Sequence, residues 1–181
     1  MPGASPFEAV QSYLDPIRET LACITDCPIT NYGGNFVSDR PHRFTFTAKP
    51  PVARLLGTDL RLFVSQQYSI EQAEKRNPLY RVKTEGYAYR LDDEDGHEIL
   101  AYHWHPLPNP TDPVKYPHLH FERGAQVGRR ELRTGHIPSG RIAMESLALY
   151  LIEVWGVKPA RLDWREVLER NLGIFDQHKS W

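Results

Sequence analysis

Residues 80–105 read YRVKTEGYAYRLDDEDGHEILAYHWH and contain two apolar alternations separated by an acidic turn. Alternation with a period of two predicts strands, because successive side chains of a strand point to opposite faces. The phase changes at Glu85–Gly86, which predicts a β-bulge at that point. The acidic turn at residues 92–96 ends in glycine and can close a hairpin. This stretch therefore predicts the central hairpin of an antiparallel sheet.

The same alternation predicts further strands on both sides of this hairpin. The five predicted strands span residues 43–48, 60–68, 80–91, 97–105 and 118–122. Together they form an antiparallel β-meander over about residues 43–122. An antiparallel sheet commonly buries one face, so we expect helices on one face and an open or cleft-lining face on the other.

The N-terminal residues carry a helix-start pattern. Ser5 is a predicted N-cap, Pro6 occupies the first helical position and Glu8 completes a capping box. Apolar residues then recur three or four positions apart, which predicts a helical segment over residues 5–26. Pro16 lies inside this pattern and predicts a kink or a restart.

Two helices are predicted over about residues 139–173, after the sheet. Ser139 is the expected cap of the first and Gly156 its stop, whereas Asp163 begins the second and Gly173 ends it. Helix, meander and two helices, in that order, predict one α+β domain over residues 1–181.

Composition excludes several classes of protein. The 181 residues are 40% hydrophobic and 25% charged, which suits a globular core rather than a disordered chain. Lys and Arg number 22 against 23 for Asp and Glu, so the net charge of -1 argues against binding nucleic acid or membrane by bulk charge alone. Without a run of ~20 apolar residues or a signal-peptide pattern, we expect a cytoplasmic protein with no membrane partner.

The two cysteines, Cys23 and Cys27, are expected to be reduced, partly buried thiols. A zinc site at this spacing would need two further ligands from elsewhere in the chain.

Two His-x-His pairs are the strongest candidates for chemistry. His103 and His105 lie on one predicted strand, and His118 and His120 lie on the next. Because the residues between them are aromatic or leucine, all four imidazoles should point away from the core face. If His105 lies opposite His118, then His103 lies opposite His120, and the four form one patch. Gly86 and Ala88 are expected beside it, leaving room above the rings.

This patch has three interpretations. As general acid and base, His103, His105, His118 and His120 could cleave a phosphodiester near neutral pH without a cofactor. As neutral imidazoles they could bind zinc or iron, with Glu122 as a carboxylate ligand. The third interpretation is a polar sheet face without chemistry.

A second candidate site lies at residues 134–141, before the predicted helix. His136, Ser139 and Arg141, with the backbone N–H groups of a helix start, would suit a phosphate group. The alternative is an ordinary capped helix. His42, His97 and His178 stand alone in the sequence and are expected to be surface or cap residues.

Three segments of the second half resemble a group of uncharacterised, mainly actinobacterial histidine-hairpin proteins. They are HIPSGR at residues 136–141, GVKP at residues 156–159 and DWREVL at residues 163–168. More distantly, the region from Tyr80 to Phe121 is similar to TumE-type toxins of toxin–antitoxin modules. The matching positions are His105, Pro106, Pro117, His118 and His120. This second resemblance implies RNA cleavage and a protein partner encoded nearby.

The leading hypothesis is therefore an RNase-like enzyme, a toxin or defence component, acting on RNA or another phosphodiester through the histidine patch. Local cations would contact phosphates. These are Lys83, Arg90, Lys115 and Arg123. One alternative is a metal-dependent oxygenase or hydrolase, and another is a non-catalytic binding or partner protein. Metal content separates the first two, and catalysis by the isolated protein counts against the third.

Overall fold

The computed structural model describes residues 2–32, 36–38, 40–72, 79–106, 114–121, 126–127, 130–131 and 136–178. Its helices are α1 (Pro6–Ala22), α2 (Met144–Glu153) and α3 (Trp164–His178). Its main sheet contains β1 (Pro2–Gly3), β2 (Ile29–Tyr32), β3 (His42–Phe46), β4 (Val52–Arg54), β5 (Arg61–Gln72), β6 (Tyr80–Asp92), β7 (Glu98–Trp104), β8 (His118–Phe121) and β11 (Ile137–Pro138). The short strands β9 (Gln126–Val127) and β10 (Arg130–Glu131) pair with each other.

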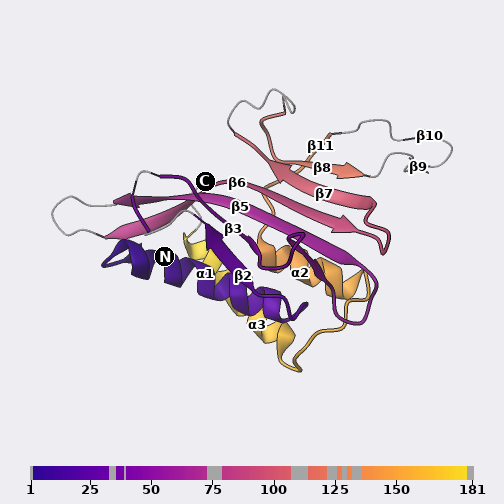
Figure 1. Ribbon diagram of the computed structural model, residues 1–181, viewed down its shortest axis with the longest axis horizontal. Helices are drawn as coiled ribbons and strands as arrows, with labels where there is room; N and C mark the ends of the chain where they lie inside the picture. Colours follow the sequence, from indigo (N-terminus) through magenta and orange to yellow (C-terminus); the bar gives the residue numbers. More distant parts are fainter. Residues whose placement is uncertain are drawn as a thin grey trace.

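The sheet is antiparallel and its strand order is β11-β8-β7-β6-β5-β3-β2 (Figure 1). Strand β1 is added to β6, and β4 is added to β5. The hairpin of β6 and β7 forms as predicted. Its turn closes with a hydrogen bond from the Asp93 N–H to the His97 carbonyl at 2.9 Å, and Gly96 has a φ of +87°. The expected α+β architecture is confirmed.

The predicted bulge is present between β5 and β6. Gln67 pairs with Gly86 and the next residue, Tyr68, pairs with Thr84, so Glu85 is the extra residue of β6. This extra residue accounts for the change of phase in the sequence, because it moves the following side chains to the other face.

Helix α1 begins as the sequence predicts. Ser5 Oγ accepts a hydrogen bond from the Glu8 N–H at 3.2 Å, and the Glu8 carboxylate accepts one from the Ala4 N–H at 2.9 Å. The helix continues through Pro16 to Ala22 without the predicted restart. Asn171 of α3 donates to the Pro16 carbonyl at 3.0 Å and so joins the two helices.

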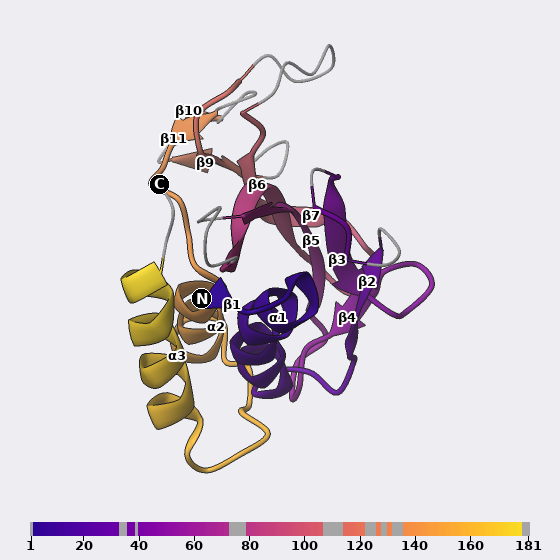
Figure 2. The same cartoon turned by 90° about the vertical axis from the view of Figure 1, so that its left-hand side faces the viewer.

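All three helices lie on one face of the sheet (Figure 2). The core fills the space between them and that face, and its largest fully buried side chains include Tyr68, Phe44 and Phe46. The described part of the chain places no helix over the opposite face of β7 and β8 (Figures 1 and 2). Among the described residues, no helix has the length and apolarity needed to cross a bilayer.

Three local predictions are wrong. Residues 29–32, which the five predicted strands leave out of the sheet, form an edge strand beside β3. Ser139 does not cap a helix, because Ile137 and Pro138 pair with β8 and the chain stays extended until α2 begins at Met144. Helix α3 runs past Gly173 to His178, since a glycine weakens a helix without ending it.

Two other predictions agree with the structure. Gly156 follows the end of α2 with a φ of +72°. Cys23 is buried, Cys27 is half-buried and neither forms a disulfide.

Candidate metal centre

Strands β7 and β8 place the histidines on the sheet face opposite the helices. His103 lies directly opposite His118, and Ala101 lies opposite His120. The predicted register, which pairs His105 with His118, is wrong by two residues. Strand β7 ends at Trp104, so His105 lies beyond the last residue pair of β7 and β8. A two-residue shift does not change which face a side chain occupies, so the predicted face is correct.

The rings of four histidines lie close together on β7, β8 and the residue that follows β7. The His103 ring centroid lies 5.4 Å from His105, 5.7 Å from His118 and 4.7 Å from His120. The His118 and His120 centroids are 4.7 Å apart. One ring nitrogen each from His103, His118 and His120 lies within 4.8 Å of the other two.

A fifth imidazole reaches this cluster from β11. Ile137 pairs with Leu119 of β8, and His136, the residue before it, therefore lies beside the β8 histidines. The His136 ring centroid is 4.9 Å from His118 and 4.4 Å from His120. We use "histidine cluster" below for His103, His105, His118, His120 and His136.

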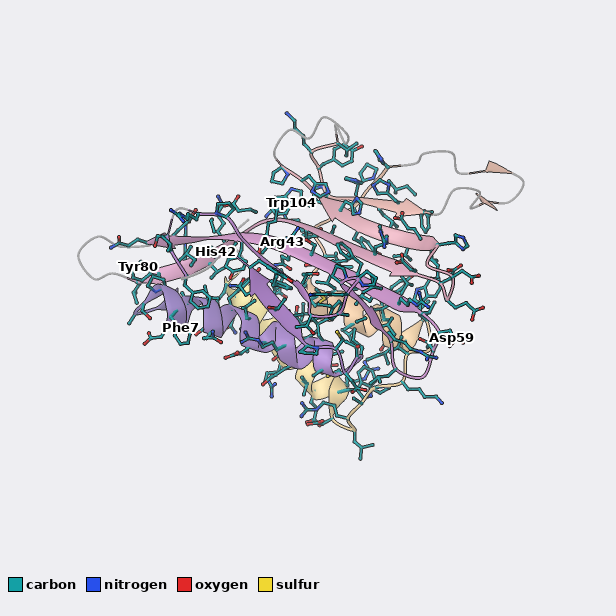
Figure 3. All side chains as sticks on the ribbon, in the orientation of Figure 1. Phe7, His42, Arg43, Asp59, Tyr80 and Trp104 are labelled. Atoms are coloured by element: carbon teal, nitrogen blue, oxygen red, sulfur yellow. The ribbon has the colours of Figure 1, made fainter. Side chains whose placement is uncertain are left out.

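The other residues of the predicted phosphate site do not form the expected helix start. The Ser139 N–H donates to the Pro117 carbonyl at 2.9 Å, as part of the β11 edge. The Arg141 guanidinium lies 3.5 Å from the centre of the Trp104 ring, and Trp104, at the end of β7 in Figure 3, belongs to the buried face. The predicted ligand Glu122 lies outside the described residues.

His118 has a defined tautomer. Its side chain is fully buried, and Nδ1 lies 2.8 Å from the Tyr116 carbonyl oxygen. A carbonyl only accepts, so Nδ1 carries the proton and donates it. Nε2 is then the ring nitrogen with the lone pair in the neutral side chain. Metal-binding histidines typically donate their other N–H to a carbonyl or carboxylate in this way, which fixes the ring and raises its basicity.

Small residues lie next to the cluster on β6 and β7. Ala88 pairs with His103, and Ala101 is fully buried beside His120 in the ladder. Gly86 lies further along β6, where an added Cβ would be only 2.8 Å from the Trp104 carbonyl oxygen. Glycine at this position lets β6 approach the end of β7, which carries the first His-x-His pair.

Two of the cations predicted to contact phosphates are in ion pairs. Lys83 lies 3.6 Å from Glu71 and 3.3 Å from Glu85, and Arg90 lies 2.7 Å from Asp92. Arg123 lies outside the described residues. Phosphate contacts by Lys83 and Arg90 would therefore compete with carboxylates already in place.

The remaining histidines differ in their environments. His42 is buried, with its ring stacked on Tyr68 at 5.3 Å and its Nε2 2.9 Å from the Val37 carbonyl, so the prediction of a surface position is wrong. His97 is exposed and lies 3.2 Å from Asp93 in the hairpin turn, and His178 is exposed at the end of α3. These last two agree with the predicted surface or cap positions.

The cluster can support two kinds of chemistry. Three neutral imidazoles with converging nitrogens can bind a transition-metal ion, and one protonated and one neutral imidazole can act as general acid and base. No family model, curated protein or solved structure matches this chain, so its function is inferred below from the geometry of the site.

Proposed function

We propose that the protein is a metal-dependent hydrolase that binds a transition-metal ion through His103, His118 and His120. The observation that carries this proposal is the convergence of three ring nitrogens within 4.8 Å. A metal ion bound to three imidazoles needs N–metal distances of about 2.0–2.1 Å, which small side-chain rotations can provide from this starting geometry. The tautomer of His118, set by the Tyr116 carbonyl, presents Nε2 as a donor and supports the same assignment.

The donor set favours zinc. The group made by His103, His118 and His120 contains only imidazoles, and His₃ with an open position is an established catalytic zinc arrangement. Iron in non-haem oxygenases prefers two histidines and one carboxylate, and Glu122 is the carboxylate that the sequence offers for that role. Bound zinc would supply a Lewis acid and activate water for attack on a phosphodiester or a related ester.

His136 and His105 have separate roles in this proposal. The His136 ring is close enough to His118 and His120 to become a fourth ligand or to move a proton near the ion. His105 contacts His103 beyond the end of β7, where it supports that ring. A fourth imidazole ligand would close the site, so catalysis requires His136 to leave a position open for water.

A second candidate is metal-free acid–base cleavage of RNA by the same histidines. The specific observation in its favour is the close ring pair His120 and His136, with centroids 4.4 Å apart on the face over which the described residues place no helix. A neutral and a protonated imidazole at this distance can remove and deliver protons at a phosphodiester. Cytoplasmic location, a role as toxin or defence component and a protein partner encoded nearby remain predictions attached to either candidate.

One experiment separates the two candidates. Hydrolysis of bis(p-nitrophenyl) phosphate and of a short RNA is measured for protein treated with a chelator and for the same protein after zinc is restored. Metal-dependent hydrolysis predicts activity only after zinc addition. It also predicts that this activity is lost in His118→Gln but not in His178→Gln, a variant of an exposed histidine at the end of α3. Full activity on RNA in the chelator would contradict the metal proposal and support the acid–base candidate. No hydrolysis under either condition would contradict both and leave the non-catalytic interpretation.

A further inference from the structure

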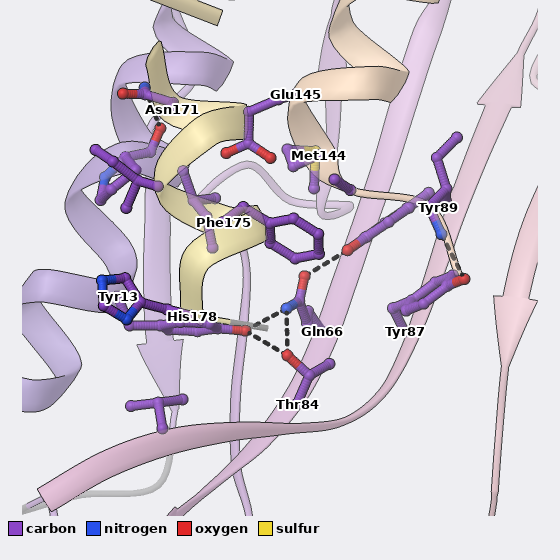
Figure 4. A pocket seen from close by; sticks show the side chains of 16 residues that line it. Tyr13, Gln66, Thr84, Tyr87, Tyr89, Met144, Glu145, Asn171, Phe175 and His178 are labelled. Atoms are coloured by element: carbon purple, nitrogen blue, oxygen red, sulfur yellow. Dashed lines mark hydrogen bonds between the residues drawn. The ribbon is translucent and has the colours of Figure 1, made fainter. Parts of the chain in front are cut away.

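A partly open cavity lies on the other side of the sheet, between β5, β6 and the three helices (Figure 4). Its volume of about 60 Å³ is several times the roughly 10–15 Å³ that one water requires. Much of the wall is apolar, with contributions from Ile17, Val82, Met144, Ile174 and Phe175. A cavity with apolar walls and a few converging polar groups is the usual form of a small-molecule site.

The sheet side of this cavity is lined by neutral polar side chains that form hydrogen bonds with one another. The Gln66 side-chain amide donates to Tyr13 and Thr84, and its oxygen accepts from Tyr89 (Figure 4). Tyr13 and Thr84 also share a hydrogen bond of 3.1 Å. Burial raises the pKa of both tyrosines, so these phenols stay neutral at physiological pH. This wall is therefore hydrogen-bonded and uncharged.

The helix side carries one buried carboxyl group, Glu145, in the first turn of α2. Its side chain is 3% exposed, and Oε1 accepts a hydrogen bond from Thr20 at 3.4 Å. None of the ion pairs among the described residues involves Glu145, and Asp176 of α3 adds another negative charge nearby. His178 at the cavity edge does not balance it, because partial desolvation of this largely exposed ring lowers the pKa of the imidazole. Burial raises the pKa of Glu145 to about 7.

A buried carboxylate without a cation is costly, and a ligand that brings the cation removes that cost. The cavity also presents aromatic rings from Tyr13, Tyr89 and Phe175, whose faces attract cations. We propose that this cavity binds a small primary amine with a short apolar body, whose ammonium group pairs with the Glu145 carboxylate. The site is separate from the histidine cluster, which lies on the opposite face of the sheet.

Butylamine and 1-butanol form a matched pair of probes, because they have the same number of heavy atoms and differ in charge. At pH 8, where Glu145 is largely ionised, binding of each is measured by calorimetry and by thermal shift. We expect wild-type protein to bind butylamine more tightly than 1-butanol. Glu145→Gln should weaken butylamine binding by at least about tenfold, the loss typical of a hydrogen bond to a charged group, while Glu166→Gln, an exposed control, should not.

Ile174→Trp is a second variant that keeps the carboxyl group and fills the cavity. It should abolish binding of both probes while preserving the unfolding transition. Equal affinity for butylamine and 1-butanol, or no binding of butylamine to the wild-type protein, would overturn the proposal. If Glu145→Gln folds, unchanged affinity of that variant for butylamine would also overturn the proposal. If it does not fold, unchanged butylamine affinity in Ile174→Trp would overturn it.

Discussion

His103 and His118 lie directly opposite each other on β7 and β8, with ring centroids 5.7 Å apart. Cross-strand neighbours in a sheet are held at nearly fixed separation, so this pairing brings the two His-x-His motifs together without any long-range loop contact. The His118 ring is fixed further by its hydrogen bond to the Tyr116 carbonyl. The pair therefore supplies two preorganised ligands of the proposed metal site, and His120 supplies the third.

The first prediction concerns the ranking of the histidines. His118→Gln should lower zinc affinity by more than about 100-fold, because it removes a buried ligand whose tautomer is already set. His105→Gln should lower it by less than about tenfold, since this ring supports His103 from outside the ladder. Competition with a chromogenic chelator measures both. His178→Gln, at the exposed end of α3, is the control, and equal losses in His118→Gln and His178→Gln would contradict the assignment.

The second prediction concerns pH and zinc. Protons compete with the metal for imidazole nitrogens, and free histidine has a pKa of about 6.5. Zinc affinity should therefore be constant above about pH 7.5 and fall steeply below about pH 6.5, as more than one proton displaces each ion. Competition titrations at several pH values test this, and an affinity that does not change between pH 5.5 and 7.5 would exclude imidazole ligands.

The third prediction concerns Gly86 and the geometry of β7. Gly86→Ala places a Cβ 2.8 Å from the Trp104 carbonyl, so β6 and the end of β7 must separate. Overpacking of this kind costs about 1–3 kcal/mol, which urea unfolding can measure. Zinc affinity should fall as well, because His103 and His105 lie on the displaced segment. Gly140→Ala is the matched control, since a Cβ there meets nothing within 4 Å, and identical behaviour of the two variants would contradict the prediction.

The fourth prediction follows from the pKa of Glu145, which burial raises from 4.5 to about 7. The folded state therefore binds this proton more tightly than the unfolded chain. The protonated Glu145 carboxyl group therefore stabilises the folded state fully below about pH 4.5. This stabilisation is lost as the pH rises towards 7, and above pH 7 little of it is left to lose. The free energy of unfolding should fall by about 3 kcal/mol over this range, because one pKa unit corresponds to about 1.4 kcal/mol.

Glu145→Gln should not lose stability in this way as the pH rises, because glutamine does not titrate. Relative to the wild-type protein, the variant should gain stability between pH 4.5 and pH 8, with the gain read from urea unfolding at each pH. Glu166→Gln, on the exposed side of α3, should follow the wild-type profile. A constant difference between wild type and Glu145→Gln across this range would show that the carboxyl group titrates normally.

Local sequence rules predicted the parts of the fold that local interactions determine. The α1 cap, the hairpin turn and the bulge at Glu85 each depend on neighbouring residues, and each agrees with the structure. The edge strands β2 and β11 were not predicted, because two to four residues carry no periodic pattern and gain their hydrogen bonds from strands distant in sequence.

The candidate site was predictable in its residues and face but not in its register. Alternation along β7 and β8 determines the face, whereas register depends on where each strand begins, and β8 begins at His118. The sequence alone suggests a phosphate loop for His136. Its place in the cluster depends on the pairing of β11 with β8, which the sequence does not reveal. The Glu145 cavity has no sequence signal, since an acidic residue in a first helical turn usually faces solvent.

Zinc stoichiometry tests the central claim most directly. The chain is stripped with a chelator, titrated with zinc at pH 7.5 and analysed for bound metal after gel filtration, beside the His103→Gln, His118→Gln double variant. The proposed site predicts one zinc per wild-type chain and none retained by the folded double variant. Wild-type protein that retains no zinc, or a double variant that retains as much as the wild type, would contradict a metal centre at these histidines.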